Sequence, residues 1–144
     1  MTSRYPEMSI DTAAISRNAE KVVKLCGEKG IRVWGVTKGV SAHPAVASAM
    51  LEGGCAGLAD SRVDNIWKLR LFGFRQPMML LRIPMPGEMR DLVEAVDCCL
   101  VSMPKSVLML DRSCEEAGTE ISIIVMVDLG DLREGIWPDG VEEM

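Results

Sequence analysis

The stretch Val36-Thr37-Lys38-Gly39-Val40 decides how the fold of this chain is interpreted. It places a lysine at the end of an apolar, β-branched run and directly before a glycine. In folds that alternate strands and helices, ligands bind at the carboxyl ends of the strands, so Lys38 would present its amine there. Apolar surroundings favour the neutral, nucleophilic form of an amine, which can form a Schiff base with a carbonyl group. The alternative is a solvated lysine at a strand end, and the neighbouring motifs decide between the two.

The composition is that of an ordinary globular protein. The chain has 144 residues, 48% hydrophobic and 26% charged, so we treat residues 1–144 as one domain with its own core. A net charge of -5 and a pI near 4.9 predict no nucleic-acid partner. No apolar run approaches the length of a membrane span, and the first residues lack the apolar core of a signal peptide. A cytoplasmic protein without a membrane partner is therefore expected.

The cysteines indicate neither a disulfide framework nor a zinc site. Their number is odd, no C-x-x-C pair occurs, and His43 is the single histidine. The five are Cys26, Cys55, Cys98, Cys99 and Cys114. Most have apolar neighbours and are expected to be small buried side chains of a reduced compartment, so no metal site is predicted. A catalytic pair of a cysteine with His43 stays open, although nothing local favours it.

Apolar periodicity and turn residues predict alternating helices and strands. Asp11 is the expected N-cap of a first helix that Gly30 ends. Further helices are expected after His43-Pro44, over residues 61–71, around residues 89–96 and after Pro104. Strands are expected at residues 32–38, 55–59, 78–83, 97–102 and 120–128, and the last of these is the strongest.

This order predicts an α/β fold with a parallel sheet and right-handed crossovers. No G-x-G-x-x-G follows the first strand, which argues against a dinucleotide-binding fold. A helix followed by regular βα units suits a (β/α)8 barrel of the TIM type, but only five βα units can be counted where a barrel needs eight. We therefore expect a partial barrel, the front part of a longer protein, in which the first and fifth strands have unpaired edges.

Three segments resemble, in order, the amino-terminal barrel of the alanine racemase family, the fold-type-III pyridoxal-phosphate enzymes. Ile10-Asp11 with Ile15 and Asn18 resembles the opening pattern I-D-x-x-x-I-x-x-N. Val36-Thr37-Lys38 resembles the first strand, which carries the cofactor lysine. The segment from Val127 to Gly135 resembles the fifth strand, where an arginine follows an aspartate-x-glycine turn. Residues 58–62 and 127–137 are most similar to the ornithine racemase branch, and the resemblance covers nearly the whole chain.

Two departures from alanine racemases argue against alanine as the preferred substrate. Met126 stands where those enzymes often carry a lysine, and the tyrosine that follows their cofactor lysine is missing. The family's phosphate-binding loops, the arginine that faces the pyridine nitrogen and the carboxy-terminal β-domain with its catalytic tyrosine have no counterpart in residues 1–144. We therefore interpret the chain as the front part of the cofactor-binding barrel.

The resemblance implies specific roles for four residues. Lys38 would be the catalytic lysine that holds pyridoxal 5'-phosphate and then acts as a general base. Arg133 would contact the substrate carboxylate or the cofactor's phenolic oxygen, because a guanidinium offers a charged fork to such oxygens. Its alternative is a surface arginine paired with a neighbouring carboxylate. Arg82 is a further candidate for cofactor binding and Arg62 for substrate binding, the latter with a solvated or ion-paired role as its alternative.

Other residues are expected to act structurally. Asp128 is expected to order the turn before Arg133 rather than to transfer a proton. The tryptophans, Trp34, Trp67 and Trp137, are expected in the core or between helices.

Three functions remain open on these grounds. The favoured one is an amino-acid racemase of the ornithine or alanine type that binds a small-molecule amino acid and is a homodimer when full length. The second is a pyridoxal-phosphate-binding homeostasis protein, a lone barrel without enzymatic activity. Because such proteins usually continue the fifth strand differently, the segment from Asp128 to Arg133 favours the racemase. The third is a folded but inactive piece, which shares every residue with the first.

Overall fold

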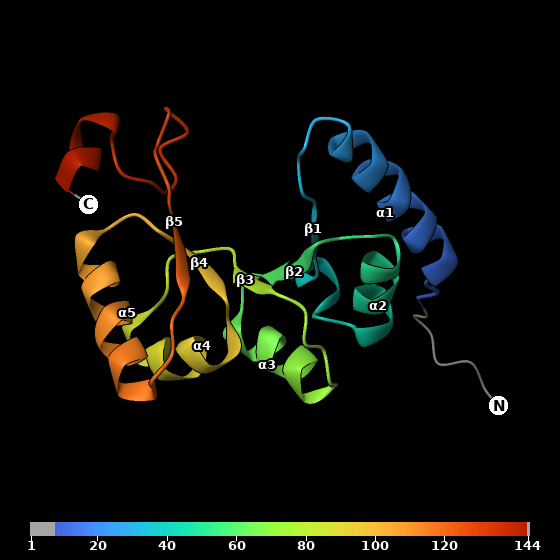
Figure 1. Ribbon diagram of the computed structural model, residues 1–144, viewed down its shortest axis with the longest axis horizontal. Coiled ribbons are helices and arrows are strands. Elements are labelled where there is room, and N and C mark those ends of the chain that lie inside the picture. The colour runs from blue at the N-terminus through green and yellow to red at the C-terminus, as the bar shows by residue number, and fades with distance from the viewer. Residues whose placement is uncertain (1–7, 144) are drawn as a thin grey trace.

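The computed structural model describes residues 8–143 of the chain (Figure 1). Its helices and strands alternate as the sequence predicts. The α-helices are α1 (Thr12–Gly27), α2 (Pro44–Glu52), α3 (Val63–Leu71), α4 (Met89–Ala95) and α5 (Pro104–Ala117). The strands are β1 (Trp34–Val36), β2 (Gly57–Asp60), β3 (Met78–Leu80), β4 (Cys98–Val101) and β5 (Ser122–Val125). Short 3-10 turns are η1 (Lys38–Val40), η2 (Pro86–Glu88) and η3 (Pro138–Glu143).

The strands form one parallel sheet in the order β1-β2-β3-β4-β5. Each strand pairs with the next one along the chain, so every connection is a βα crossover of the kind that builds a barrel. The helices follow an arc around the strands (Figure 1). Strands β1 and β5 lie at the two edges of this sheet, which confirms the expected α/β partial barrel with two unpaired edges.

The core lies between the sheet and its helices. On the outer face of the sheet, five side chains of β2, β3 and β4 are at most 1% exposed; they are Leu58, Met78, Leu80, Cys99 and Val101. Alternate positions face the other side, where Val36 is 42% and Ile124 44% exposed. Because side chains alternate between the faces of a strand, one face packs against helices and the other lines the open inner side of the partial barrel.

Local signals mark the ends of several helices, although α1 ends at Gly27, three residues before the Gly30 that the sequence predicts as its stop. The Asp11 side chain accepts a hydrogen bond from the Ala14 backbone N–H at 2.9 Å, so it caps α1. Pro44 and Pro104 stand in the first turns of α2 and α5, where a proline loses no helical hydrogen bond. Gly118 ends α5 in the left-handed region with φ 65°.

The fifth strand is shorter than the sequence predicts. A strand is expected at residues 120–128, and β5 forms there with four residues, of which Ser122, Ile123 and Ile124 are exposed. An apolar run predicts the strand, but its burial depends on a neighbour that covers it. The structure gives β5 one partner strand among the described residues, β4, so its outer edge stays open.

The tryptophans and cysteines divide between core and surface. Trp67 donates from Nε1 to the Asp91 carbonyl at 2.9 Å and joins α3 to α4, as expected of a helix-packing residue. Trp137 is 59% exposed, so the expectation of a core position was wrong for it. Cys98 and Cys99 are buried, and burial raises the pKa of the Cys99 thiol to about 12. The remaining three cysteines are only partly buried.

No helix among residues 8–143 is long and apolar enough to cross a membrane. The same residues contain no group of three or more histidine, cysteine or acidic side chains arranged to hold a metal ion.

Candidate active site at the carboxyl ends of the strands

Lys38 stands on a tight turn directly after β1. The turn η1 is closed by the Thr37 carbonyl, which accepts from the backbone N–H groups of Val40 and Ala42, each at 3.1 Å. The Lys38 side chain is exposed, and the structure gives it no ion pair with any described residue. The first strand therefore presents an accessible primary amine at its carboxyl end, as the sequence predicts.

The turn continues through two residues with unusual backbone angles. Ser41 and Ala42 have φ of 49° and 52°, in the left-handed region that residues with a Cβ rarely adopt. Ala42 is fully buried, and Lys68 donates from Nζ to the Ser41 carbonyl at 2.9 Å. Packing and this hydrogen bond hold the strained segment in place, and strain of this kind gathers at functional sites.

A buried polar network joins the end of β1 to the end of β2. Thr37 and Asp60 have no exposed surface, and the Thr37 hydroxyl donates to Asp60 Oδ2 at 2.8 Å. The other carboxylate oxygen, Oδ1, accepts from the Arg62 backbone N–H at 3.0 Å and from Asn65 Nδ2 at 2.9 Å. This network connects the residue before Lys38 to the first turn of α3. Sequence reasoning assigned Thr37 and Asp60 no role of their own, although both lie in segments that carry the family resemblance.

Arg82 is bound on several sides. Its Nε donates to the Ser61 carbonyl at 2.7 Å and its Nη1 to the Ile83 carbonyl at 3.0 Å. Both Nη atoms also donate to the Glu88 carboxylate, with Nη2 at 2.7 Å from Oε2. The hydrogen bonds that Arg82 donates to Glu88 are the main reason that the pKa of Arg82 is raised. Burial by itself would raise the pKa of Glu88, but the hydrogen bonds from Arg82 and from the Met85 backbone outweigh it, and the pKa is lowered.

Arg62 lies near Arg82 but is more exposed. It precedes α3, and its Nη2 lies 3.4 Å from Asp64 Oδ2 in a pair whose side chains are 69% and 85% exposed. Arg62, Arg82, Asp64 and Glu88 line one polar hollow of about 340 Å³ at the carboxyl ends of β2 and β3. The structure thus brings these two arginines together and surrounds them with carboxylates.

Arg133 stands on a loop after β5. The loop is closed at its base, because the Asp128 N–H donates to the Ile136 carbonyl at 2.9 Å and the Ile136 N–H to the Met126 carbonyl at 2.8 Å. Gly135, with φ 130°, packs so closely that an added Cβ would lie 2.6 Å from the Asp128 nitrogen. Arg133 itself is exposed, and the structure gives it no ion pair with any described residue.

Asp128 orders this loop. Its Oδ1 accepts from the backbone N–H groups of Gly130 at 2.7 Å and Leu132 at 3.3 Å. The hydrogen bond from Gly130 is the main reason that the pKa of Asp128 is lowered. These contacts confirm the expectation that Asp128 shapes the turn that carries Arg133.

The four residues selected from the sequence all follow carboxyl ends of strands, but they do not form one cluster. Lys38 follows the edge strand β1, and Arg133 follows the opposite edge strand β5. Arg62 and Arg82 lie between them, after β2 and β3. The same end of the sheet therefore carries the exposed Lys38 amine and the guanidinium groups of these three arginines.

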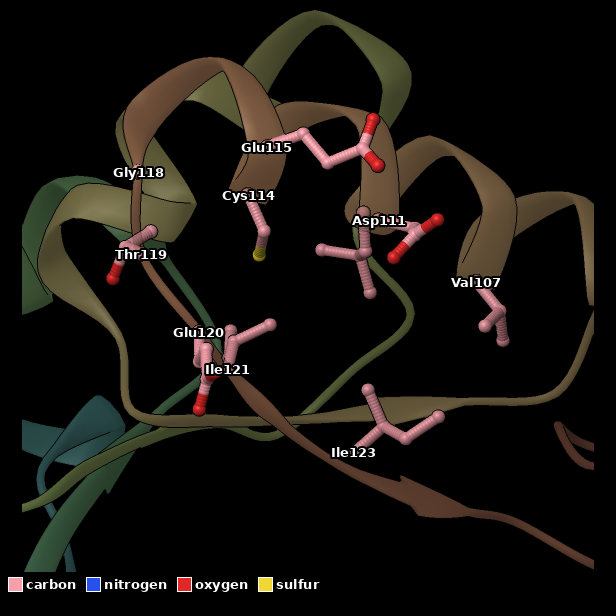
Figure 2. A pocket seen from close by; sticks show the side chains of 10 residues that line it. Val107, Asp111, Cys114, Glu115, Gly118, Thr119, Glu120, Ile121 and Ile123 are labelled. Atoms are coloured by element: carbon pink, nitrogen blue, oxygen red, sulfur yellow. The ribbon is translucent and has the colours of Figure 1, made fainter.

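A larger hollow of about 900 Å³ lies elsewhere, between α5 and β5, and contains none of these four residues. Leu110, Cys114 and Ile123 line it, with Asp111 and Glu115 of α5 around it. Figure 2 shows the Cys114 sulfur and the two carboxylates on the helix side and Ile121 and Ile123 on the strand side. This hollow is where the open edge of the sheet leaves the inner side of α5 uncovered.

The parallel sheet, in which each strand pairs with the next βα unit, is that of an α/β protein of the TIM-barrel class. A lysine follows its first strand, and further polar groups lie at the same end. The family can be stated as well. The chain belongs to the alanine racemase family, because the model of the alanine racemase N-terminal domain matches residues 10–144.

Characterised relatives and a solved structure agree with this assignment. The chain is 37% identical over 141 residues to the lysine racemase of Thermotoga maritima and 34% identical over 131 residues to the ornithine racemase of Acetoanaerobium sticklandii. These matches cover 97% and 91% of this chain but 40% and 36% of the relatives, so the chain spans about two fifths of their length. The alanine racemase of a D-cycloserine-producing Streptomyces lavendulae shares the fold, with a TM-score of 0.82 and 24% identity over 93% of this chain and 35% of that one.

Proposed function

We propose that this chain supplies the cofactor-lysine part of a pyridoxal-phosphate-dependent amino-acid racemase, and that its substrate is a basic amino acid such as lysine or ornithine. The observation that carries the proposal is the identity of 37% and 34% to a lysine and an ornithine racemase over nearly the whole chain. Met126 and the absence of a tyrosine after Lys38 support a preference for these substrates over alanine.

The residues present fit pyridoxal phosphate by the chemistry of their donors. Lys38 offers an exposed amine without an ion-pair partner among residues 8–143, which a covalently held aldehyde requires. Arg133 offers an exposed guanidinium suited to a carboxylate or a phenolic oxygen. Arg82 is a weaker candidate, since Glu88 already accepts from both of its Nη atoms. Arg62 is free to serve a substrate carboxylate only if it leaves Asp64.

The chemistry then assigns one task to each residue. When bound, pyridoxal phosphate supplies the electron sink that makes the Cα proton of an amino acid removable. The Lys38 amine would hold the cofactor and, once the amino group of the substrate has displaced it, would take that proton on one face of the amino acid. Arg133 orients the reacting groups through their anionic oxygens. A second acid must return the proton on the opposite face, and we expect it from a part of the racemase beyond the segment matched here.

Three further features of the whole protein are proposed on the resemblance alone. We expect residues 1–144 to be the amino-terminal part of the cofactor-binding barrel, the complete racemase to be a homodimer, and its location to be the cytoplasm. Sedimentation of the complete racemase at several concentrations tests the dimer.

Reductive labelling tests the role of Lys38. Borohydride added to the protein with pyridoxal phosphate should attach the cofactor to Lys38, and peptide mapping should locate it there. The Lys38→Ala variant should lose this label, whereas Lys105→Ala, which removes an exposed lysine of α5, should keep it. A label distributed equally over the exposed lysines would contradict the assignment.

A chimera tests the activity. In the lysine racemase of Thermotoga maritima, the matched segment would be replaced by this chain. A chimera that melts cooperatively should racemise lysine or ornithine when given pyridoxal phosphate, and its Lys38→Ala form should not. A folded, labelled chimera that racemises no amino acid would favour a cofactor-binding protein without enzymatic activity.

A further inference from the structure

Asp60 is a buried carboxylate without a cation. Its side chain has no exposed surface, and no lysine, arginine or histidine among residues 8–143 lies within ion-pair distance of it. An ionised group in the interior is costly unless hydrogen bonds satisfy it. Three donors do so here: the Thr37 hydroxyl, the Arg62 backbone N–H and the Asn65 amide. These donors come from the end of β1, the β2–α3 connection and α3, so the carboxylate joins three elements.

Thr37 uses every polar group it has to shape the turn that carries Lys38. Its N–H donates to the Ala59 carbonyl at 2.9 Å, which extends the pairing of β1 with β2 by one residue. Its carbonyl accepts from Val40 and Ala42 and thereby closes the turn. Its hydroxyl donates to Asp60 at 2.8 Å, and the Ala59 carbonyl lies 3.3 Å from the same oxygen. The side-chain bond to Asp60 fixes the residue from which the Lys38 backbone departs.

The other end of the sheet is held by a different device. There Asp97 accepts from Arg70 Nη2 at 2.6 Å and from the Met78 backbone N–H at 2.8 Å, and its side chain is 54% exposed. At the amino ends of β3 and β4, Asp97 thus binds the start of β3 through the Met78 N–H and binds α3 through a partly solvated ion pair. A buried carboxylate without a cation is found at the carboxyl end, next to the lysine. Because the two ends of the sheet are joined differently, the buried position of Asp60 beside Lys38 requires its own explanation.

We propose that Asp60 is a positioning residue: by accepting the Thr37 hydroxyl and the first groups of α3, it holds the β1 turn so that the Lys38 amine faces the cofactor. The inference rests on the proposed function, since it concerns the delivery of that amine. Asp60 acts through Thr37, and we assign it no contact with the reacting atoms.

Two substitutions of Thr37 separate the hydroxyl from the shape of the side chain. Thr37→Val keeps the branched shape but removes the donor to Asp60, whereas Thr37→Ser keeps the donor. Asp97→Asn is the control, because it removes the ion pair to Arg70 at the far end of the sheet. Two quantities are measured at equal folded fraction: the rate of Lys38 labelling by pyridoxal phosphate and borohydride relative to Lys105, and hydrogen exchange of the Val40 and Ala42 amides.

In Thr37→Val, the Lys38 labelling rate should fall about tenfold and exchange at Val40 and Ala42 should accelerate, because a buried acceptor loses its donor. Thr37→Ser and Asp97→Asn should keep both quantities close to those of the unchanged chain. Equal labelling in Thr37→Val and the unchanged chain, or an equal loss in Asp97→Asn, would overturn the inference. A chain in which Lys38 is never labelled, even unsubstituted, would contradict the proposed function instead, so the two failures can be told apart.

Discussion

Arg82 and Glu88 form a bidentate ion pair: both Nη atoms of the guanidinium donate to the carboxylate, with Nη2 at 2.7 Å from Oε2. Glu88 Oε1 also accepts from the Met85 N–H at 2.8 Å, so the pair ties the segment after β3 to the turn before α4. The two side chains are 27% and 22% exposed, which makes this a partly buried ion pair. The geometry therefore supports a structural role for Arg82 more than the cofactor contact suggested by the family resemblance.

Removal of the charge on Glu88 should destabilise the fold. We expect Glu88→Gln to lower the free energy of unfolding by about 1–3 kcal/mol, because a hydrogen-bonded, half-buried guanidinium loses its anion. Urea denaturation measures this loss. The control is Glu94→Gln, which removes a 3.8 Å pair with the exposed Arg90 and should cost at most about 0.5 kcal/mol. Equal losses in the two variants would show that the Arg82 pair contributes little.

The same pair should make stability depend on acid. Because the folded pKa of Glu88 lies below its ordinary value, the pair stabilises the fold fully above the unfolded carboxyl pKa of about 4.3, and this contribution is lost as the pH falls through the folded pKa. The difference in unfolding free energy between the unchanged chain and Glu88→Gln should therefore shrink below about pH 4. A difference that stays constant down to the acid limit would contradict this assignment.

Asp128 should control the order of the Arg133 loop. In Asp128→Ala, the amides of Gly130 and Leu132 lose their acceptor, so their hydrogen exchange should accelerate. Because the pKa of Asp128 is lowered in the folded chain, the loop should also open as the pH falls through that lowered value. Asp139→Ala, in the exposed part of η3, is the control and should leave these amides unchanged.

Arg133 should affect turnover more than folding. In the lysine racemase chimera, Arg133→Ala should cost on the order of 2–4 kcal/mol of transition-state stabilisation, typical of a lost charged hydrogen bond in a site. Steady-state kinetics measures the loss, and Arg112→Ala, at an exposed position of α5, is the control. Near-normal turnover together with a lower melting temperature would instead assign Arg133 a structural role.

The open edge at β5 should make the isolated chain associate with itself. The hollow beside α5 exposes apolar surface, with Ile123 at 40% exposure, and the outer edge of β5 has no partner among the described residues (Figure 2). Unpaired strand edges and apolar patches favour association between chains. Light scattering after size-exclusion chromatography should show oligomers that diminish in Ile123→Lys. Leu71→Lys, at an 83% exposed position at the end of α3, should leave them unchanged. A monodisperse, cooperatively melting monomer that racemises an amino acid would contradict both this prediction and the view that essential residues lie outside the chain.

Local patterns predicted most of the fold. The order of helices and strands, the Asp11 cap and the position of Lys38 after an apolar run are set by residues that are close in sequence. Their signals are strong because helix periodicity, caps and prolines act within a few residues. The family resemblance added the barrel class, which the shared fold and the matching domain model confirm.

Contacts between distant residues were decided only by the tertiary structure. The sequence indicates that residues 120–128 are apolar, but whether they are buried depends on a neighbouring strand, and β5 lies at an edge. Arg82 has the charge expected of an anion site, yet its orientation follows from Glu88 and the Ser61 carbonyl. Thr37 and Asp60 are 23 residues apart and meet because β1 and β2 pair in one particular register. The sequence alone therefore determined that a lysine follows the first strand, while strand register and packing determined which residues meet beside it, because these contacts depend on parts of the chain that only folding brings together.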